Sequence, residues 1–190
     1  MDTHGIFFAL LLKCLQYIFA HMKFLVAGLG NVGNEYAHTR HNIGFDVVMA
    51  FATRHGGQFR SDRLAFTAEV KYKGRVFICI CPTTYMNLSG KAVKYWMDKE
   101  KIAKENLLVV FDDIAIPLPK IRLRPGGSDA GHNGLKSIQE SLGTSDYPKL
   151  RFGIGNDLLF SGGKLKSAER GELRGIGIVH HILQWPAFPV

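Results

Sequence analysis

Short apolar runs alternate with longer amphipathic stretches between residues 23 and 154 of this chain. Runs with strand spacing lie at 23–27, 66–72, 75–81, 106–111, 121–123 and 150–154. Stretches with helical spacing lie directly after Asn42, at 89–97 and at 133–142. Strands that alternate with helices in this way form α/β sheets. Lys73-Gly74 predicts a hairpin between two of the runs, Asn42 is predicted to cap the first helix, and Gly143 is predicted to end the last one.

The two ends of the chain depart from this pattern. Residues 6–20 are apolar apart from Lys13 and Gln16, but a membrane span needs about 20 apolar residues. A signal peptide needs a positive amino end and a small-residue cleavage site, and neither is present. We therefore expect residues 1–21 to be an extension outside the fold, 22–157 to form one domain, and 158–190 to be an atypical tail.

The composition favours a globular protein that binds a polyanion. Lys and Arg together number 24 against 16 Asp and Glu, which gives a net charge of +8 at pH 7. A positive excess of this size favours a partner such as nucleic acid. With 46% hydrophobic and 21% charged residues, the chain is not disordered, collagen-like or a coiled coil. Its 3 cysteines are too few for a disulfide scaffold and predict reduced thiols in a cytoplasmic protein.

A glycine-rich loop, Gly28-x-Gly30-x-x-Gly33, follows the first apolar run. This spacing is typical of dinucleotide binding when a helix opens on the loop and an acidic residue ends a second strand about 20 residues later. Here the helix begins only after Asn42, and Asp46 falls inside it. We therefore expect no nicotinamide or flavin cofactor, and we interpret the glycines as a tight crossover that brings the backbone close to a substrate.

Two residues carry candidate acid–base chemistry. His41 follows the glycine-rich loop, and a histidine can accept a proton from water near neutral pH. Asp112 and Asp113 directly follow the most apolar run, and the carboxyl ends of strands are where α/β sheets bind ligands. An aspartate there can hold an imidazole in the correct tautomer, although a capped loop is the ordinary alternative. No second acidic cluster is visible, so we expect no metal.

Amide and basic side chains follow in the later segments. Asn87 and Asn133 can both donate and accept hydrogen bonds, and Ser89 is predicted to cap the helix at 89–97. The glycines at 126–134 predict a close backbone approach or a flexible loop. Around that loop lie basic residues suited to phosphate contact, with solvated surface as the ordinary alternative: Arg122, Arg124, Lys136, Lys149 and Arg151.

Taken together, these segments resemble the bacterial peptidyl-tRNA hydrolase family. The match is carried by GLGNVGNEYAHTRHNIGF at 28–45, PTTYMNLSGKAV at 82–93, LLVVFDDIAIP at 107–117, GSDAGHNGLKSI at 127–138 and RFGIGN at 151–156. The resemblance implies a single α/β domain with a twisted mixed sheet flanked by helices, of the phosphorylase/hydrolase-like kind. It also implies hydrolysis of the ester between a peptide and the terminal ribose of tRNA, which releases the tRNA for reuse, without a metal or an organic cofactor.

The resemblance also implies roles for individual residues. His41 corresponds to the general base of the family, and Asp112 to the residue that orients it. The substrate-binding residues implied are Asn31, Tyr36, Tyr85, Met86, Asn87 and Asn133, and the residues expected to bind tRNA are Arg122, Arg124, Lys136 and Arg151. We expect a cytoplasmic monomer whose partner is tRNA and which does not contact a membrane. The first alternative is a non-catalytic RNA-binding relative of the same fold. The second is an oxidoreductase, which the spacing after the glycine-rich loop disfavours.

Overall fold

A computed structural model describes residues 22–37, 39–118 and 120–155. The predicted extension at 1–21 and the predicted tail at 158–190 lie outside the described residues. Within them a seven-stranded sheet has the strand order β2-β3-β4-β1-β5-β7-β6. Its strands are β1 (Lys23–Gly28), β2 (Arg60–Asp62), β3 (Ala65–Tyr72), β4 (Arg75–Pro82), β5 (Leu107–Asp113), β6 (Ile121–Arg124) and β7 (Lys149–Gly153).

The four central strands of the sheet run parallel. β1 pairs in parallel with β4 and β5, and β5 pairs in parallel with β7. The outer pairs β2–β3, β3–β4 and β6–β7 are antiparallel, so the sheet is mixed and the predicted fold class is confirmed. Because the carboxyl ends of the parallel strands meet at one edge, that edge is where the fold would bind a ligand.

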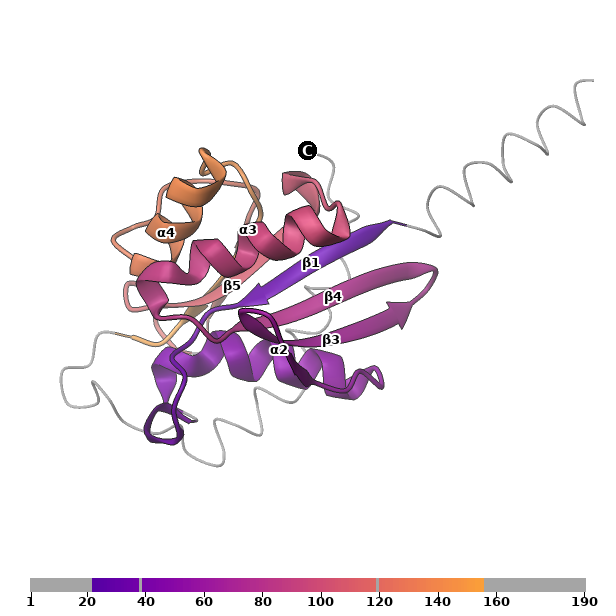
Figure 1. Cartoon of the computed structure of the whole chain (residues 1–190). Coiled ribbons are helices and arrows are strands. Elements are labelled where there is room, and N and C mark those ends of the chain that lie inside the picture. Colours follow the sequence, from indigo (N-terminus) through magenta and orange to yellow (C-terminus); the bar gives the residue numbers. More distant parts are fainter. Residues whose placement is uncertain (1–21, 38, 119, 156–190) are drawn as a thin grey trace, which may run out of the picture.

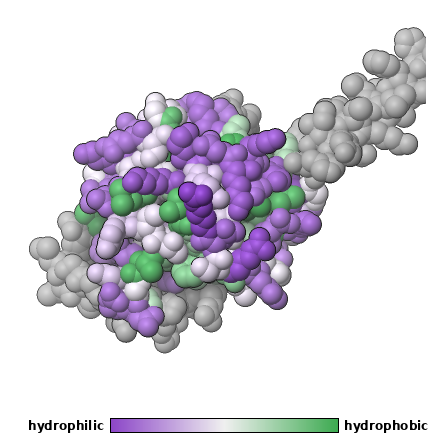
Figure 2. Space-filling model, viewed as in Figure 1, coloured by the Kyte–Doolittle hydropathy of each residue, from purple (hydrophilic) through white to green (hydrophobic). Residues whose placement is uncertain are grey.

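Helices cover both faces of the sheet (Figure 1). α2 (Ile43–Arg54) packs on one face, where Val48 and Phe51 join a buried cluster with Phe77 of β4. α3 (Ser89–Glu100) and α4 (Asn133–Leu142) pack together on the other face in a second cluster. The apolar stripes of these helices are therefore buried, and the face shown in Figure 2 is largely hydrophilic with small separate hydrophobic patches.

Among the described residues, three short 3₁₀ helices occupy loops at the carboxyl edge, and a fourth lies at the amino end of β5. η1 (Asn34–Tyr36) and η2 (Arg40–Asn42) follow β1, and η3 (Met86–Leu88) follows β4. The fourth, η4 (Lys104–Asn106), precedes β5. Since η2 leads directly into α2 and η3 directly into α3, the residues on these turns are held at fixed positions beside the sheet edge.

Two glycines allow α2 to approach the sheet closely. A Cβ atom on Gly28 would lie 2.3 Å from the carbonyl oxygen of Gly44, and a Cβ atom on Gly44 would lie 2.3 Å from that of Leu29. No side chain fits at such distances. The close approach that these two positions permit is therefore to helix α2, and it places η2 against the end of β5. Asn31 of the same loop lines the cavity described below.

Most predicted elements are present, and two predicted caps are wrong. The hairpin at Lys73-Gly74 joins β3 to β4, and Gly143 ends α4 with a φ of 70°. Asn42 stands at the N-cap position of α2, but its side chain makes no capping bond. Ser89 is the first residue of α3, and its hydroxyl lies 3.9 Å from the Met86 sulfur. The short strand β2 was not predicted.

Candidate active site

A cavity of about 370 Å³ opens at the carboxyl edge of the parallel strands. Its walls come from the loop after β1, from η2 and η3, from the end of β5 and from the loop that precedes α4. The lining residues are Asn31, His41, Met86, Phe111, Asp112, Asp113, Ile114, Asp129, Ala130, Gly131, His132 and Asn133. Five predicted site residues, which are distant in sequence, thus share one cavity: Asn31, His41, Met86, Asp112 and Asn133.

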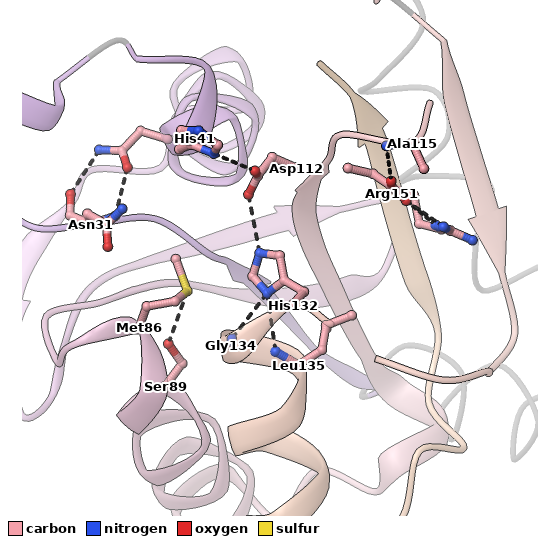
Figure 3. Close-up of polar contacts among 12 residues, drawn as sticks. Asn31, His41, Met86, Ser89, Asp112, Ala115, His132, Gly134, Leu135 and Arg151 are labelled. Atoms are coloured by element: carbon pink, nitrogen blue, oxygen red, sulfur yellow. Dashed lines mark hydrogen bonds and ion pairs between the residues drawn. The ribbon is translucent and has the colours of Figure 1, made fainter. Parts of the chain in front are cut away.

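His41 and Asp112 form a hydrogen bond inside this cavity (Figure 3). The Nδ1 atom of His41 lies 2.8 Å from Oδ2 of Asp112. The histidine side chain is 46% exposed, whereas that of the aspartate is 8% exposed. Because a carboxylate only accepts, Nδ1 carries the proton, and Nε2 of the neutral ring is left as a proton acceptor.

A second histidine, His132, holds the other oxygen of Asp112. The Nδ1 atom of His132 accepts hydrogen bonds from the backbone N–H groups of Gly134 and Leu135 at 3.1 and 3.3 Å, so it serves as the N-cap of α4. The proton of the neutral ring is therefore on Nε2, which donates to Oδ1 of Asp112 at 3.2 Å. Both carboxylate oxygens are held by imidazoles, and Figure 3 shows Asp112 between His41 and His132.

These contacts shift the pKa of both members of the pair. Burial on its own raises the pKa of the Asp112 carboxyl, but the hydrogen bonds from His132 and His41 outweigh it and leave the pKa below its ordinary value. The hydrogen bond to Asp112 raises the pKa of His41 above its ordinary value, against a smaller opposing effect of burial. Asp112 is therefore a permanent anion at neutral pH, and it makes His41 a stronger base.

Asn42 fixes the position of Asn31. Its side-chain oxygen accepts from the backbone N–H of Asn31 at 2.7 Å, and its amide nitrogen donates to the carbonyl oxygen of Asn31 at 2.8 Å. The Asn42 side chain therefore binds the glycine-rich loop instead of capping α2. This pair of bonds holds the loop of Asn31 against η2, the turn that carries His41.

The remaining predicted substrate residues lie at or beside the cavity. Asn133 is the first residue of α4 and lines the wall with Met86. Asn87 is exposed on η3 and does not line the cavity. Tyr36 and Tyr85 are 43% and 82% exposed, on the loops that follow β1 and β4.

The predicted tRNA-binding residues are partly exposed and partly paired. Arg122 and Arg124 are exposed on β6, and Lys136 is exposed on α4. Arg151 of β7 forms an ion pair with Asp113, with its Nε and Nη2 atoms 2.6 and 2.5 Å from Oδ2. Lys149 is buried and donates to the carbonyl groups of Ser145 and Tyr147, so our interpretation of this lysine as part of a basic rim is wrong.

Sequence reasoning assigned no role to three polar residues that line the cavity, Asp113, Asp129 and His132. His132 lies within the motif at 127–138, and its signal was that it precedes a helix, although histidine is an uncommon N-cap. Asp113 follows Asp112 directly, but its arginine partner depends on the pairing of β5 with β7. Among the described residues, no group of three or more His, Cys, Asp or Glu side chains is arranged to hold a metal ion.

The fold and the cavity together define an α/β enzyme that can activate water. A histidine with one nitrogen held by a carboxylate can remove a proton with the other, and side-chain amides beside it can donate to a developing oxyanion. This is the arrangement needed to hydrolyse an ester or a related acyl bond.

Comparisons with known proteins narrow this class to one family. The family described as Peptidyl-tRNA hydrolase matches residues 25–168. A relative from Phocaeicola vulgatus named peptidyl-tRNA hydrolase is 57% identical over 136 residues, 72% of this chain and 73% of the relative. One with the same name from Porphyromonas gingivalis is 52% identical over 143 residues, 75% of this chain and 76% of the relative.

A solved structure agrees with the sequence comparisons. The crystal structure of peptidyl-tRNA hydrolase from Acinetobacter baumannii superposes with a TM-score of 0.76 at 33% identity, covering 87% of this chain and 89% of that one. The chain therefore belongs to the peptidyl-tRNA hydrolase family and is an enzyme.

Proposed function

We propose that this chain hydrolyses the ester bond between a peptide and the terminal ribose of tRNA, with His41 as general base and Asp112 as the residue that orients it. The observation that carries the assignment of roles is the 2.8 Å hydrogen bond between the two side chains in an open cavity. Membership of the family supports the substrate.

The reaction begins with water. Nε2 of His41 takes a proton from a water molecule as the water oxygen attacks the ester carbonyl carbon, and a tetrahedral oxyanion forms. Asp112 stabilises the imidazolium without taking its proton. The oxyanion then collapses, the bond to the ribose oxygen breaks, and the imidazolium returns its proton to that oxygen. The products are the peptide acid and free tRNA, and the base is regenerated.

Amide groups around the cavity supply the donors that this oxyanion needs. Asn31 and Asn133 line the same cavity as His41, and each side-chain amide carries two N–H donors. Donors already in place before the reaction stabilise the charge that develops in the transition state. We assign these two amides to the carbonyl oxygen and the peptide, and the exposed Asn87 to the substrate at the rim of the cavity.

The charges of the site favour a position of the tRNA phosphates outside the cavity. Asp112, Asp113 and Asp129 line it, and among the described residues no lysine or arginine does. A phosphate would be repelled there, whereas the uncharged ester and ribose would not. The exposed cations of β6 and α4, Arg122, Arg124 and Lys136, are the groups suited to the phosphates, and the exposed rings of Tyr36 and Tyr85 are suited to stack on a base or an apolar side chain.

Hydrolysis of an N-acetyl-aminoacyl-tRNA tests this proposal. His41→Ala should fold normally and lower kcat by a factor of about 10² or more, because it removes the general base. His55→Ala is the matched control, since it removes a histidine that lies outside the cavity lining. Turnover in the His41 variant equal to that of the control would exclude His41 as the base. A wild-type chain that binds tRNA without hydrolysis would favour the alternative of a non-catalytic RNA-binding relative.

We also propose that the enzyme works as a monomer in the cytoplasm. In the part of the chain that the structure describes, no helix has the length and apolar character needed to span a bilayer. All the residues assigned to catalysis come from one chain, so the site does not need a second copy. Light scattering after size-exclusion chromatography would show the oligomeric state, and a stable dimer would contradict this assignment.

A further inference from the structure

Asp113, the residue after the proposed orienting carboxylate, holds an arginine beside the cavity. Its Oδ2 atom accepts from Nε and Nη2 of Arg151, while its Oδ1 atom accepts from the backbone N–H of Ala115 at 2.9 Å (Figure 3). The side chain of Asp113 is 7% exposed and that of Arg151 is 26% exposed. The carboxylate is therefore fixed, and it fixes one edge of the guanidinium in turn.

General-base catalysis by His41 does not use the Asp113–Arg151 pair, and the sheet places this pair next to another cation. Arg151 lies directly opposite Arg122 in the β6–β7 register, so the two side chains share one face of the sheet. Like charges that face each other across a strand pair are unfavourable unless an anion lies close to both. Asp113 approaches from β5 and uses two of the five N–H groups of Arg151, which leaves three for another acceptor.

We propose that Asp113 is a positioning residue for tRNA. It fixes Arg151 so that the free edge of the guanidinium and Arg122 together bind a phosphate of the acceptor end, next to the cavity that holds the ester. One peptide unit of β5 separates Asp112, which orients the base, from Asp113, which orients the phosphate contact. The end of β5 thus sets the distance between the phosphate and the reacting bond. This inference rests on the proposed function, since it concerns the same substrate.

Simple electrostatics and positioning predict opposite effects of removing the Asp113 charge. If the carboxylate only adds negative charge near the tRNA, Asp113→Asn should strengthen tRNA binding. If it positions Arg151, the same change should weaken binding because the guanidinium loses its fixed orientation. Asparagine keeps the oxygen that accepts from Ala115, so the substitution spares the turn after β5.

Kinetics on two substrates test the inference. With N-acetyl-aminoacyl-tRNA, Asp113→Asn should raise KM about fivefold or more and leave kcat nearly unchanged, and the salt dependence of log(kcat/KM) should flatten by about one phosphate contact. With the N-acetyl-aminoacyl ester of adenosine, which has no phosphate, the variant should match the wild type. Arg151→Gln should behave in the same way, and adding Asp113→Asn to it should change nothing further. Glu69→Gln, on β3, removes an equal charge and should leave KM unchanged.

Several results would overturn this role. A lower or unchanged KM for Asp113→Asn would leave only the electrostatic effect. An equal rise in KM on the adenosine ester, or additive effects in the double variant, would indicate general damage to the site and not a phosphate contact. If the wild type hydrolysed neither substrate, the proposed function would fall together with the inference. Normal wild-type turnover with an unchanged KM in Asp113→Asn would remove the inference alone.

Discussion

The chemistry of a single imidazole decides how this enzyme should respond to pH. His41 accepts a proton only when its ring is neutral, and the hydrogen bond to Asp112 raises its pKa above 6.5. As the pH falls through that raised pKa, the ring becomes protonated and activity is lost. We therefore expect kcat/KM to fall on the acid side at a higher pH than an ordinary histidine would give. In His41→Ala the remaining rate should not show this acid limb.

Asp112→Asn should move this acid limb to lower pH. The amide carries no charge, so it no longer raises the pKa of His41 and the ring stays neutral further into acid. The rate at the plateau should nevertheless fall by about tenfold or more, because the base loses its orientation and its counter-charge. Rates measured from acid to neutral pH on the variant and the wild type would check both effects.

The matched control for this shift is Asp98→Asn, on the far turns of α3. It removes the same charge from an exposed position that pairs with Lys94. An acid limb that moves equally in both variants would show that net charge sets the His41 pKa, and would remove the specific role of Asp112.

Single site residues could be predicted where a sequence motif itself indicates the role. His41 and Asp112 were predicted from neighbouring residues and from a family resemblance, and the structure brings them into contact. The contacts of His132 and Asp113 could not be predicted, because each depends on which segments lie side by side in the folded sheet. Asn42 shows the same limit. Its position just before α2 predicted a helix cap, but its side-chain amide binds the backbone of Asn31 instead.

Helix α4 connects the stability of the fold to the active site through its N-cap residue, His132. His132 accepts from the backbone of α4 with one nitrogen and donates to Asp112 with the other. His132→Ala removes both contacts, so it should lower the free energy of unfolding by about 1 kcal/mol and lower kcat on the order of tenfold. Chemical denaturation and steady-state kinetics would measure the two effects.

His132→Asn separates these two contacts. Asparagine is a favourable N-cap and should preserve most of the stability of α4, but its shorter side chain should not donate to Asp112 as well. We expect a variant of nearly normal stability with the lowered kcat of His132→Ala. Full activity in this variant would show that His132 serves the helix alone.

Periodicity predicted the elements themselves well, for physical reasons. β5 is buried along its whole length, and an uninterrupted apolar run marks such a strand in the sequence. β2 was missed because it has only three residues, all polar and none buried, and is held by its pairing with β3. The order of the strands could not be predicted from periodicity, since spacing along the chain does not say which strands become neighbours.

The molecule as a whole can attract tRNA through its net charge or through cations at particular positions. The chain carries a net charge of +8, which would attract any polyanion at long range. The cations assigned to the phosphates are nevertheless local. Arg122 and Arg124 alternate with the inward residues Ile121 and Leu123 on an edge strand, so that both arginines are on one exposed face.

Two double variants with the same change of charge can separate these effects. Arg122→Gln with Arg124→Gln should flatten the dependence of log(kcat/KM) on log salt by about two phosphate contacts, because tRNA binding then releases fewer counterions. Lys71→Gln with Lys73→Gln removes two charges at the β3–β4 turn, at the opposite end of β4 from the cavity. If placement decides, this second pair should leave the slope near that of the wild type. Equal slopes in the two double variants would mean that tRNA responds to the total charge, and that β6 is not part of its binding surface.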